Sequence, residues 1–163
     1  MQKKVFIGCG AGFSGDRFDA SLPIVKEFKN INEPKYLMFE VLAERTLAIA
    51  QQYRLKNPEE GYSPFLDSYI TPIIDDCLEN NIKIISNIGA ANPLGAAKRI
   101  QKIAEEQKIR KPKIGVVVGD DLLDYMSNDE ILESPTIEGL DFSNNQVTAA
   151  NVYLGAKPIA DAL

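Results

Sequence analysis

The sequence predicts an α/β fold: a Rossmann-like open parallel sheet with helices on both faces, in a three-layer α/β/α arrangement. Two observations carry this prediction, namely four short apolar runs and the segments with helical spacing that separate them. Continuous apolar runs are typical of parallel strands that are covered on both faces. Strands that alternate with helices form parallel sheets with right-handed crossovers. The expected order of elements is β-α-β-α-α-β-α-β.

The predicted strands are short and rich in branched apolar residues, and they cover residues 5–7, 36–39, 82–85 and 114–118. The first helix is expected to begin near Ser21, because Pro23 is best tolerated in a first turn. A second helix is predicted over residues 41–53. Ser63-Pro64 and Asn92-Pro93 each combine an N-cap residue with a proline at the first helical position, which predicts two further helix starts.

The later part of the chain gives weaker signals. Pro72 lies inside the apolar stripe that follows Ser63, and it predicts a kink in that helix. After residue 121 the sequence predicts a short helix over residues 122–126, a polar and turn-rich segment over 127–145, and a helix over 156–163. The 163 residues have an ordinary globular composition and are expected to form a single α/β domain.

Composition excludes several classes of protein. The net charge of −5 is a poor match to nucleic acid, and no apolar run reaches the roughly 18 residues of a membrane helix. Histidine is absent, which excludes Ser-His-Asp and Cys-His catalysis within this chain. Cys9 is interpreted as a packing residue and Cys77 as a core residue. Neither lies in a CxxC motif and no secretory leader is recognisable, so a cytoplasmic protein with free thiols is expected.

Small, polar and acidic residues follow each predicted strand, and ligands bind outside the carboxyl ends of strands in open parallel sheets. After the first strand, Gly10, Gly12 and Gly15 match the G-x-G-x-x-G pattern, in which main-chain N–H groups can reach a phosphate. Asp16 would place a negative charge beside that phosphate. Glu40 lies farther along the chain than the usual ribose-binding acid. A dinucleotide, another ligand and a closely packed turn all stay open as interpretations of this loop.

Acidic residues follow the second and fourth predicted strands. Glu40 comes directly after a strand, and on a continuous helix it would share a face with Glu44, whose alternative role is to complement the helix dipole. Asp120 and Asp121 could hold a Mg²⁺ ion or a ribose hydroxyl, or cap a helix. If the strands are neighbours, Asp16, Glu40 and Asp120 meet at three strand ends, where we expect acid–base residues.

The third predicted strand is followed by an amide-rich turn. Asn92 is a natural N-cap, whereas Asn87 and Gly89 have no ready structural explanation and suit a carbonyl, hydroxyl or phosphate ligand. Arg17 or Arg45 would hold an anionic group. The ligand-binding residues expected from these motifs are Gly10, Gly12, Ser14, Arg17, Glu44, Arg45, Asn87, Gly89, Asn92, Gly119 and Asp121.

The ordered set of motifs resembles a known family. GCGAGFSGDR, FE-x-LAERT, N-x-GAANP, V-x-GDD and N-x-YLGA occur in the order and register of the AtuA family, the acyclic terpene utilisation family, from residue 5 to the last residue. The resemblance implies a bacterial-type cytoplasmic protein in the catabolism of acyclic terpenes such as citronellol and geraniol, whose intermediates are branched acyl-CoA thioesters. It adds Asn151 and Tyr153 to the matched positions and assigns no catalytic residues. Family members are considerably longer, which implies the N-terminal part of a longer protein.

Three functions stay open at this point, and whether the protein is an enzyme stays open with them. The first is a ligand-binding or catalytic domain for a small organic or acyl-CoA-type compound, with Mg²⁺ or a nucleotide or CoA moiety as candidate cofactor. The second is an NAD- or FAD-type oxidoreductase domain. The third is a non-enzymatic interaction subunit of a catabolic complex. A small-molecule ligand and either a second copy or a C-terminal partner domain are the expected partners; nucleic acid and membranes are not.

Overall fold

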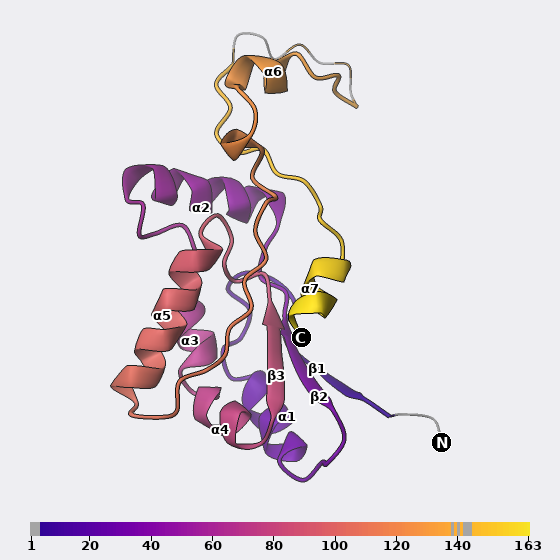
Figure 1. Cartoon of the computed structure of the whole chain (residues 1–163), viewed down its shortest axis with the longest axis vertical. Coiled ribbons are helices and arrows are strands. Elements are labelled where there is room, and N and C mark those ends of the chain that lie inside the picture. Colours follow the sequence, from indigo (N-terminus) through magenta and orange to yellow (C-terminus); the bar gives the residue numbers. More distant parts are fainter. Residues whose placement is uncertain (1–3, 138, 140, 142–144) are drawn as a thin grey trace. The chain divides into compact units, whose positions relative to one another are not determined.

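The structure is a computed structural model that describes residues 4–137, 139, 141 and 145–163 (Figure 1). It confirms the predicted fold class, a mixed α/β chain with an open parallel sheet of three strands, consistent with a three-layer α/β/α arrangement. The chain divides into two compact units, Met1–Ile114 and Gly115–Leu163. Among the described residues, no helix combines the length and the apolar character that crossing a membrane requires.

The first unit is built around the sheet, whose strand order is β1-β2-β3. The strands are β1 Phe6–Ala11, β2 Lys35–Phe39 and β3 Ile82–Ser86. They confirm the first three predicted strands. In the parallel register, Phe6 lies opposite Lys35, and Lys35 lies opposite Ile82. The register of β1 shifts between Cys9 and Ala11, which bends the strand where it enters the Gly-rich loop.

Two helices of the first unit begin where the sequence predicts, at Ser21 and Pro93, whereas the helix predicted from Ser63-Pro64 begins at Leu66, with Phe65 as its N-cap. The helices of this unit are α1 Ser21–Phe28, α2 Glu44–Lys56, α3 Leu66–Ile70, α4 Ile74–Glu79 and α5 Pro93–Glu106. Asn92 caps α5, since its Oδ1 accepts a hydrogen bond from the N–H of Gly95. The kink predicted at Pro72 is confirmed as a break between α3 and α4, because proline lacks an N–H and crowds the preceding turn.

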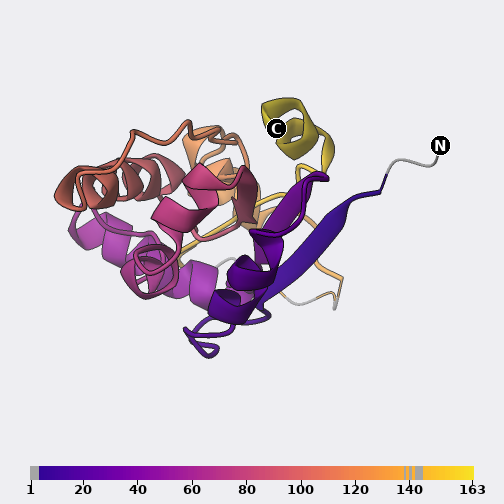
Figure 2. The ribbon, with the colours of Figure 1, turned by 90° about the horizontal axis from the view of Figure 1, so that it is seen from below.

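One face of the sheet carries the core of this unit. Leu37 and Phe39 of β2 are fully buried, and they join one apolar cluster with Val25 of α1, Tyr69 of α3 and Ile103 of α5. Figure 2 shows the helices of the first unit beside the three strands. Since side chains alternate along a strand, burial of every second residue of β2 fixes which residues turn toward the helices.

The predicted fourth strand is wrong: residues 114–118 form neither a strand nor a helix. The run IGVVV has the composition of a strand, but a strand also needs a neighbour to complete its hydrogen bonds, which composition does not supply. The second unit contains short elements, namely η1 Leu122–Asp124, α6 Asn128–Leu132 and α7 Lys157–Ala162. The first and last confirm predicted short helices.

Helix α6 lies in the segment that the sequence predicts to be turn-rich, of which residues 138, 140 and 142–144 lie outside the described residues. It begins at a capping box. The Ser127 Oγ accepts a hydrogen bond from the N–H of Glu130, and the Glu130 carboxylate accepts one from the N–H of Ser127. Ser-x-x-Glu is therefore the local signal that could have predicted this short helix.

Candidate functional site

Two predicted site residues meet at the carboxyl ends of β2 and β3. The Nδ2 group of Asn87, which follows β3, donates a 2.7 Å hydrogen bond to Oε1 of Glu40, which follows β2. The Oδ1 atom of Asn87 accepts a 2.8 Å hydrogen bond from the N–H of Val41. Ser86 adds a third link, since its Oγ donates to the carbonyl oxygen of Phe39 at 2.8 Å. Asn87 thus has partners, Glu40 and the N–H of Val41, that the sequence alone does not indicate.

The Glu40 carboxylate is held through a single oxygen atom. Oε1 accepts the hydrogen bond from Asn87 and a second one, of 3.1 Å, from the N–H of Leu42. Within the part of the chain that the structure describes, no hydrogen bond reaches Oε2. The side chain is partly buried. A carboxylate positioned in this way can accept or deliver a proton, or bind a hydroxyl group, through its second oxygen.

The Gly-rich loop closes on its own acidic residue. Asp16 Oδ2 accepts a 3.0 Å hydrogen bond from the N–H of Gly12, and Oδ1 accepts a 2.8 Å bond from the N–H of Arg17. These main-chain bonds, the one from Gly12 foremost, hold the pKa of the Asp16 carboxyl below its usual value of 3.8. Asp16 is therefore ionised at neutral pH, and it uses an N–H group that a bound phosphate would need.

Packing accounts for one glycine in this loop and backbone conformation for another. A Cβ atom on Gly10 would lie 2.5 Å from Cε1 of Phe39, so the buried ring excludes any side chain at this position. Gly15 has a φ of +85°, in the left-handed region that favours glycine. A Cβ on Gly12 would meet nothing closer than Asp16 Oδ2 at 3.9 Å. The closely packed turn, one of the open interpretations, thus has direct support.

The two candidate arginines differ in their partners. Arg17 donates from Nε and Nη2 to the Asp19 carboxylate at 2.7 and 2.8 Å, and this carboxylate raises the pKa of Arg17. Arg45 is exposed in the first turn of α2, and among the described residues it makes no hydrogen bond or ion pair. Arg45 is therefore the better placed of the two to bind an anionic group.

Glu40 and Glu44 do not share a helix face. Helix α2 starts at Glu44, and Glu40 lies in the non-helical segment before it. The N–H of Ala43 donates a 2.7 Å hydrogen bond to Oγ1 of Thr46, which satisfies one main-chain donor at the helix start. The predicted start of this helix at residue 41 is therefore wrong, because the cap lies two residues later.

Ser14, also predicted to bind a ligand, is partly buried in the Gly-rich loop.

The turn between β3 and α5 uses Asn92 and Gly89 for its own architecture. Besides capping α5, Asn92 donates from Nδ2 to the carbonyl oxygens of Pro58 and Glu60, at 3.0 and 2.8 Å. A Cβ atom on Gly89 would lie 2.6 Å from Cα of Pro93, so the turn packs directly against the helix start. Both residues thus have structural explanations. The cap made by Asn92 could be predicted from the sequence, whereas the close packing of Gly89 against Pro93 is visible only in the folded chain.

The fourth motif lies in the second unit, where Gly119, Asp120 and Asp121 follow no strand. Asp120 Oδ2 accepts a 3.0 Å hydrogen bond from Nδ2 of Asn151, and Asp121 forms an antiparallel bridge with the same asparagine. Asp121 Oδ1 also accepts a 3.0 Å bond from the N–H of Leu123, so it caps η1. The structure brings together the fourth and fifth motifs, and it confirms the capping interpretation for Asp121.

The expectation that Asp16, Glu40 and Asp120 follow three strands of one sheet is wrong for Asp120, because this residue follows no strand. In the described part of each unit, no three Asp, Glu or Cys side chains gather as metal ligands. The Mg²⁺ hypothesis therefore has no ready-made ligand set among these residues.

Other side chains supplement the predicted site. The hydroxyl of Tyr69, buried in α3, donates a 3.0 Å hydrogen bond to the carbonyl oxygen of Asp16 and so anchors the Gly-rich loop. Tyr69 lies in the apolar stripe that follows Ser63 in the sequence, and the signal that could have indicated its role is that a buried tyrosine hydroxyl needs a partner. The packing role predicted for Cys9 is wrong, since this residue is exposed. Cys77 is buried as predicted, and burial raises its pKa to about 12.

Replacing Asp16 by asparagine is expected to destabilise the protein at pH 7 and to do so less at acidic pH. The folded-state pKa of Asp16 is depressed, so its stabilising effect is present above the unfolded pKa of 3.8 and is lost as pH falls through the folded value. Urea unfolding of wild type and Asp16→Asn at pH 7, 5, 4 and 3 measures this. The difference should be constant down to about pH 5 and shrink below pH 4.

Glu33→Gln is the matched control, since Glu33 is exposed and has no hydrogen bond or ion pair among the described residues. It should change the unfolding free energy little at any of these pH values. A difference between wild type and Asp16→Asn that stays the same from pH 7 to pH 3 would contradict the assignment of the two main-chain bonds to the ionised carboxylate.

The fold and this arrangement define a class: an α/β protein with an open parallel sheet, whose polar residues gather at the carboxyl ends of its strands. The family model described as acyclic terpene utilisation family protein AtuA matches residues 5–163. The chain therefore belongs to the AtuA family, and this membership indicates a role in acyclic terpene utilisation. Comparisons with curated proteins and with solved structures each found no match.

Proposed function

We propose that the first unit is a ligand-binding, catalytic domain for a branched acyl-CoA-type intermediate of acyclic terpene catabolism. The observation that carries this proposal is the Glu40–Asn87 pair, which joins the carboxyl ends of two neighbouring parallel strands. This is the edge of an open sheet where ligands bind. The description of the matching family, acyclic terpene utilisation, supports the choice of terpene catabolism in this proposal. The proposal places the protein in the cytoplasm, where thiols stay reduced.

Glu40 is the acid–base residue of this proposal. Its carboxylate is oriented by Asn87 and by the N–H of Leu42, both through Oε1, while Oε2 is open to a substrate proton. Asp16 suits that role less, because both of its oxygens accept main-chain hydrogen bonds and its pKa is depressed. Asp120 stays a candidate for the same role without a specific observation in its favour.

Arg45 is the proposed partner for the anionic part of the ligand. A chain with a net charge of −5 repels phosphate groups unless a cation lies near the site. Arg45 stands in the first turn of α2, the helix that follows Glu40 in the chain. Asp16 weighs against a dinucleotide in the Gly-rich loop, since its carboxylate occupies the N–H of Gly12. A partner segment or second copy that completes the site stays a prediction.

Binding of the CoA thioester of citronellic acid to the full chain, measured by calorimetry, tests this function. Asn87→Ala is expected to weaken binding about tenfold, because it removes the orienting hydrogen bonds of the carboxylate. Glu40→Gln keeps the size of the side chain and should retain binding, while any turnover of the thioester falls by about 10²–10⁴-fold. The exposed Glu33→Gln variant is the control and should behave as wild type.

Free CoA and NAD are the comparison ligands. If NAD binds and the thioester does not, the nucleotide-binding alternative replaces this proposal. If neither binds, the non-enzymatic interaction subunit becomes the better reading of the chain. Binding and turnover that are unaffected by both Glu40→Gln and Asn87→Ala would place the site elsewhere.

A further inference from the structure

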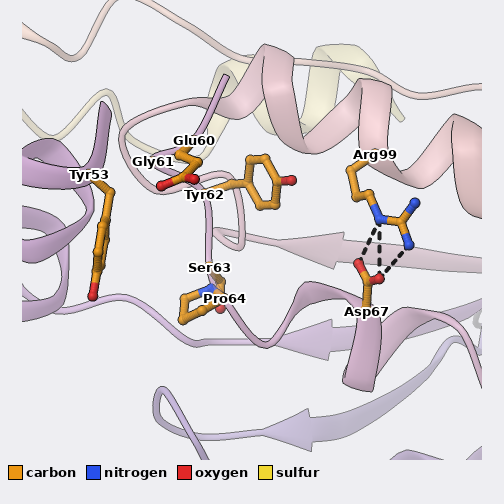
Figure 3. A pocket seen from close by; sticks show the side chains of 8 residues that line it. All are labelled: Tyr53, Glu60, Gly61, Tyr62, Ser63, Pro64, Asp67 and Arg99. Atoms are coloured by element: carbon orange, nitrogen blue, oxygen red, sulfur yellow. Dashed lines mark hydrogen bonds and ion pairs between the residues drawn. The ribbon is translucent and has the colours of Figure 1, made fainter. Parts of the chain in front are cut away.

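A pocket of about 340 Å³ lies in the first unit, apart from Glu40 and Asn87 (Figure 3). Its wall is made by the last turns of α2, by the loop that follows, and by the helices α3 and α5. The lining residues that matter here are Tyr53, Glu60, Tyr62, Pro64, Asp67 and Arg99. The volume falls at the lower end of the range for small-molecule sites. Glu40, Arg45 and Asn87, the residues of the proposed function, do not line this pocket.

The loop that forms the pocket is tied down by main-chain and side-chain hydrogen bonds. The side chain of Asn92 donates a hydrogen bond to the carbonyl oxygen of Glu60. The N–H of Ala91 donates to the carbonyl oxygen of Gly61 at 2.8 Å. The N–H of Ser63 donates to the carbonyl oxygen of Ile88 at 2.9 Å. Gly61 has a φ of +99°, and a Cβ there would lie 2.7 Å from Cβ of Arg54 on α2. The loop is thus held on both sides, so the pocket exists before any ligand arrives.

Arg99 does not make this pocket a site for anions. Its Nε donates to Asp67 at 2.9 Å, its Nη1 donates to Glu106 at 3.0 Å, and its Nη2 also contacts both carboxylates. These hydrogen bonds, the ones to Asp67 first, raise the pKa of the guanidinium and lower that of the Asp67 carboxyl. Figure 3 shows the ion pair with Asp67 at one end of the pocket. The guanidinium group of Arg99 already donates hydrogen bonds to two carboxylates, and few of its N–H groups are left to bind another anion.

The remaining walls favour a positive charge. Glu60 lies beside Tyr62 in Figure 3, and Tyr53 stands apart from the ion pair of Arg99. The carboxylate of Glu60 accepts a hydrogen bond from Nδ2 of Asn57 at 3.2 Å, which holds it near the loop. Glu60, Asp67 and Arg99 together contribute a net charge of about −1. Aromatic faces and a carboxylate are the combination that attracts organic cations.

We propose that this pocket binds a small organic cation, a primary or quaternary alkylammonium group, between Tyr53 and Tyr62 and close to Glu60. The aromatic rings and Pro64 cover the alkyl groups, and the carboxylate balances the charge. The proposal does not rest on the proposed function, because neither Glu40 nor Asn87 lines the pocket.

Titration of the full chain with choline, followed by NMR chemical shifts, tests this proposal. Choline is expected to shift resonances of the pocket residues, and 3,3-dimethylbutanol, its uncharged isostere, should bind roughly tenfold more weakly. Glu60→Gln and Tyr53→Leu should each weaken choline binding several-fold. Tyr53 is about half exposed, so the fold should tolerate its replacement. Glu59→Gln removes a neighbouring exposed carboxylate outside the pocket and should leave binding unchanged.

Three results would overturn the proposal: equal binding of choline and its uncharged isostere, tighter binding of acetate than of choline, or choline binding that neither Glu60→Gln nor Tyr53→Leu alters. Asn87→Ala separates the two sites. It should weaken thioester binding and leave choline binding as in wild type, so failure at one site is distinguishable from failure at the other.

Discussion

Replacing Phe39 by alanine is expected to lower the free energy of unfolding by about 3–5 kcal/mol. Phe39 has no exposed surface, and its ring centroid lies 5.5 Å from that of Tyr69. The ring fills the space above Gly10 on the neighbouring strand, where no side chain stands. Alanine would leave a cavity between the sheet and α3, because the strand ladder on both sides of β2 prevents the surrounding residues from closing in.

Urea denaturation of the full chain, followed by circular dichroism, measures this loss. The matched control is Phe13→Ala, since Phe13 is 60% exposed in the Gly-rich loop. The control should change the unfolding free energy by less than about 0.5 kcal/mol. Equal effects of the two substitutions would mean that Phe39 is not the centre of the core.

Replacing Gly10 by alanine is expected to lower the free energy of unfolding by about 1–3 kcal/mol. The added Cβ would lie 2.5–3.0 Å from three carbon atoms of the Phe39 ring, which is buried and has nowhere to move. Gly12→Ala is the comparison within the same motif. Its Cβ would meet only a carboxylate oxygen at 3.9 Å, so its effect on stability should be small.

A double substitution sharpens the test. In a Phe39→Leu background, which removes the ring, Gly10→Ala should cost less than it does in the wild type, by an interaction free energy of about 0.5–3 kcal/mol. Urea unfolding of the four variants gives this value. Packing would not be the reason for glycine at position 10 if the two substitutions changed the unfolding free energy additively, or if Gly12→Ala had a larger effect than Gly10→Ala. A ligand in the loop would then be the better explanation for this glycine.

Signals carried by neighbouring residues predicted much of the fold. Asn92-Pro93 predicts the start of α5 because the cap and the proline act within one turn. Pro72 predicts the break between α3 and α4 for an equally local reason. Apolar runs located β1, β2 and β3, since burial of a strand on a sheet demands such composition. Residues 114–118 have the same composition and form no strand, because pairing depends on a neighbour distant in sequence.

The candidate site divides in the same way. Asn87 and Glu40 were singled out separately by their places after strands, but their hydrogen bond spans 47 positions and required the parallel register of β2 and β3. Arg17 and Arg45 are alike in the sequence as candidate anion partners, and only the folded loop shows that Arg17 is paired with Asp19. Glu40 and Asn87, which are 47 positions apart in the chain, meet only once β2 and β3 have paired.

The sequence by itself determined the family, the fold class and the positions of most helices and strands, because motif order, apolar periodicity and capping are properties of neighbouring residues. The tertiary structure decided which glycines serve packing and that Glu40 is held by Asn87. The physical reason is that close packing and hydrogen bonding between distant residues depend on strand register and on the shape of the core, which local patterns do not contain.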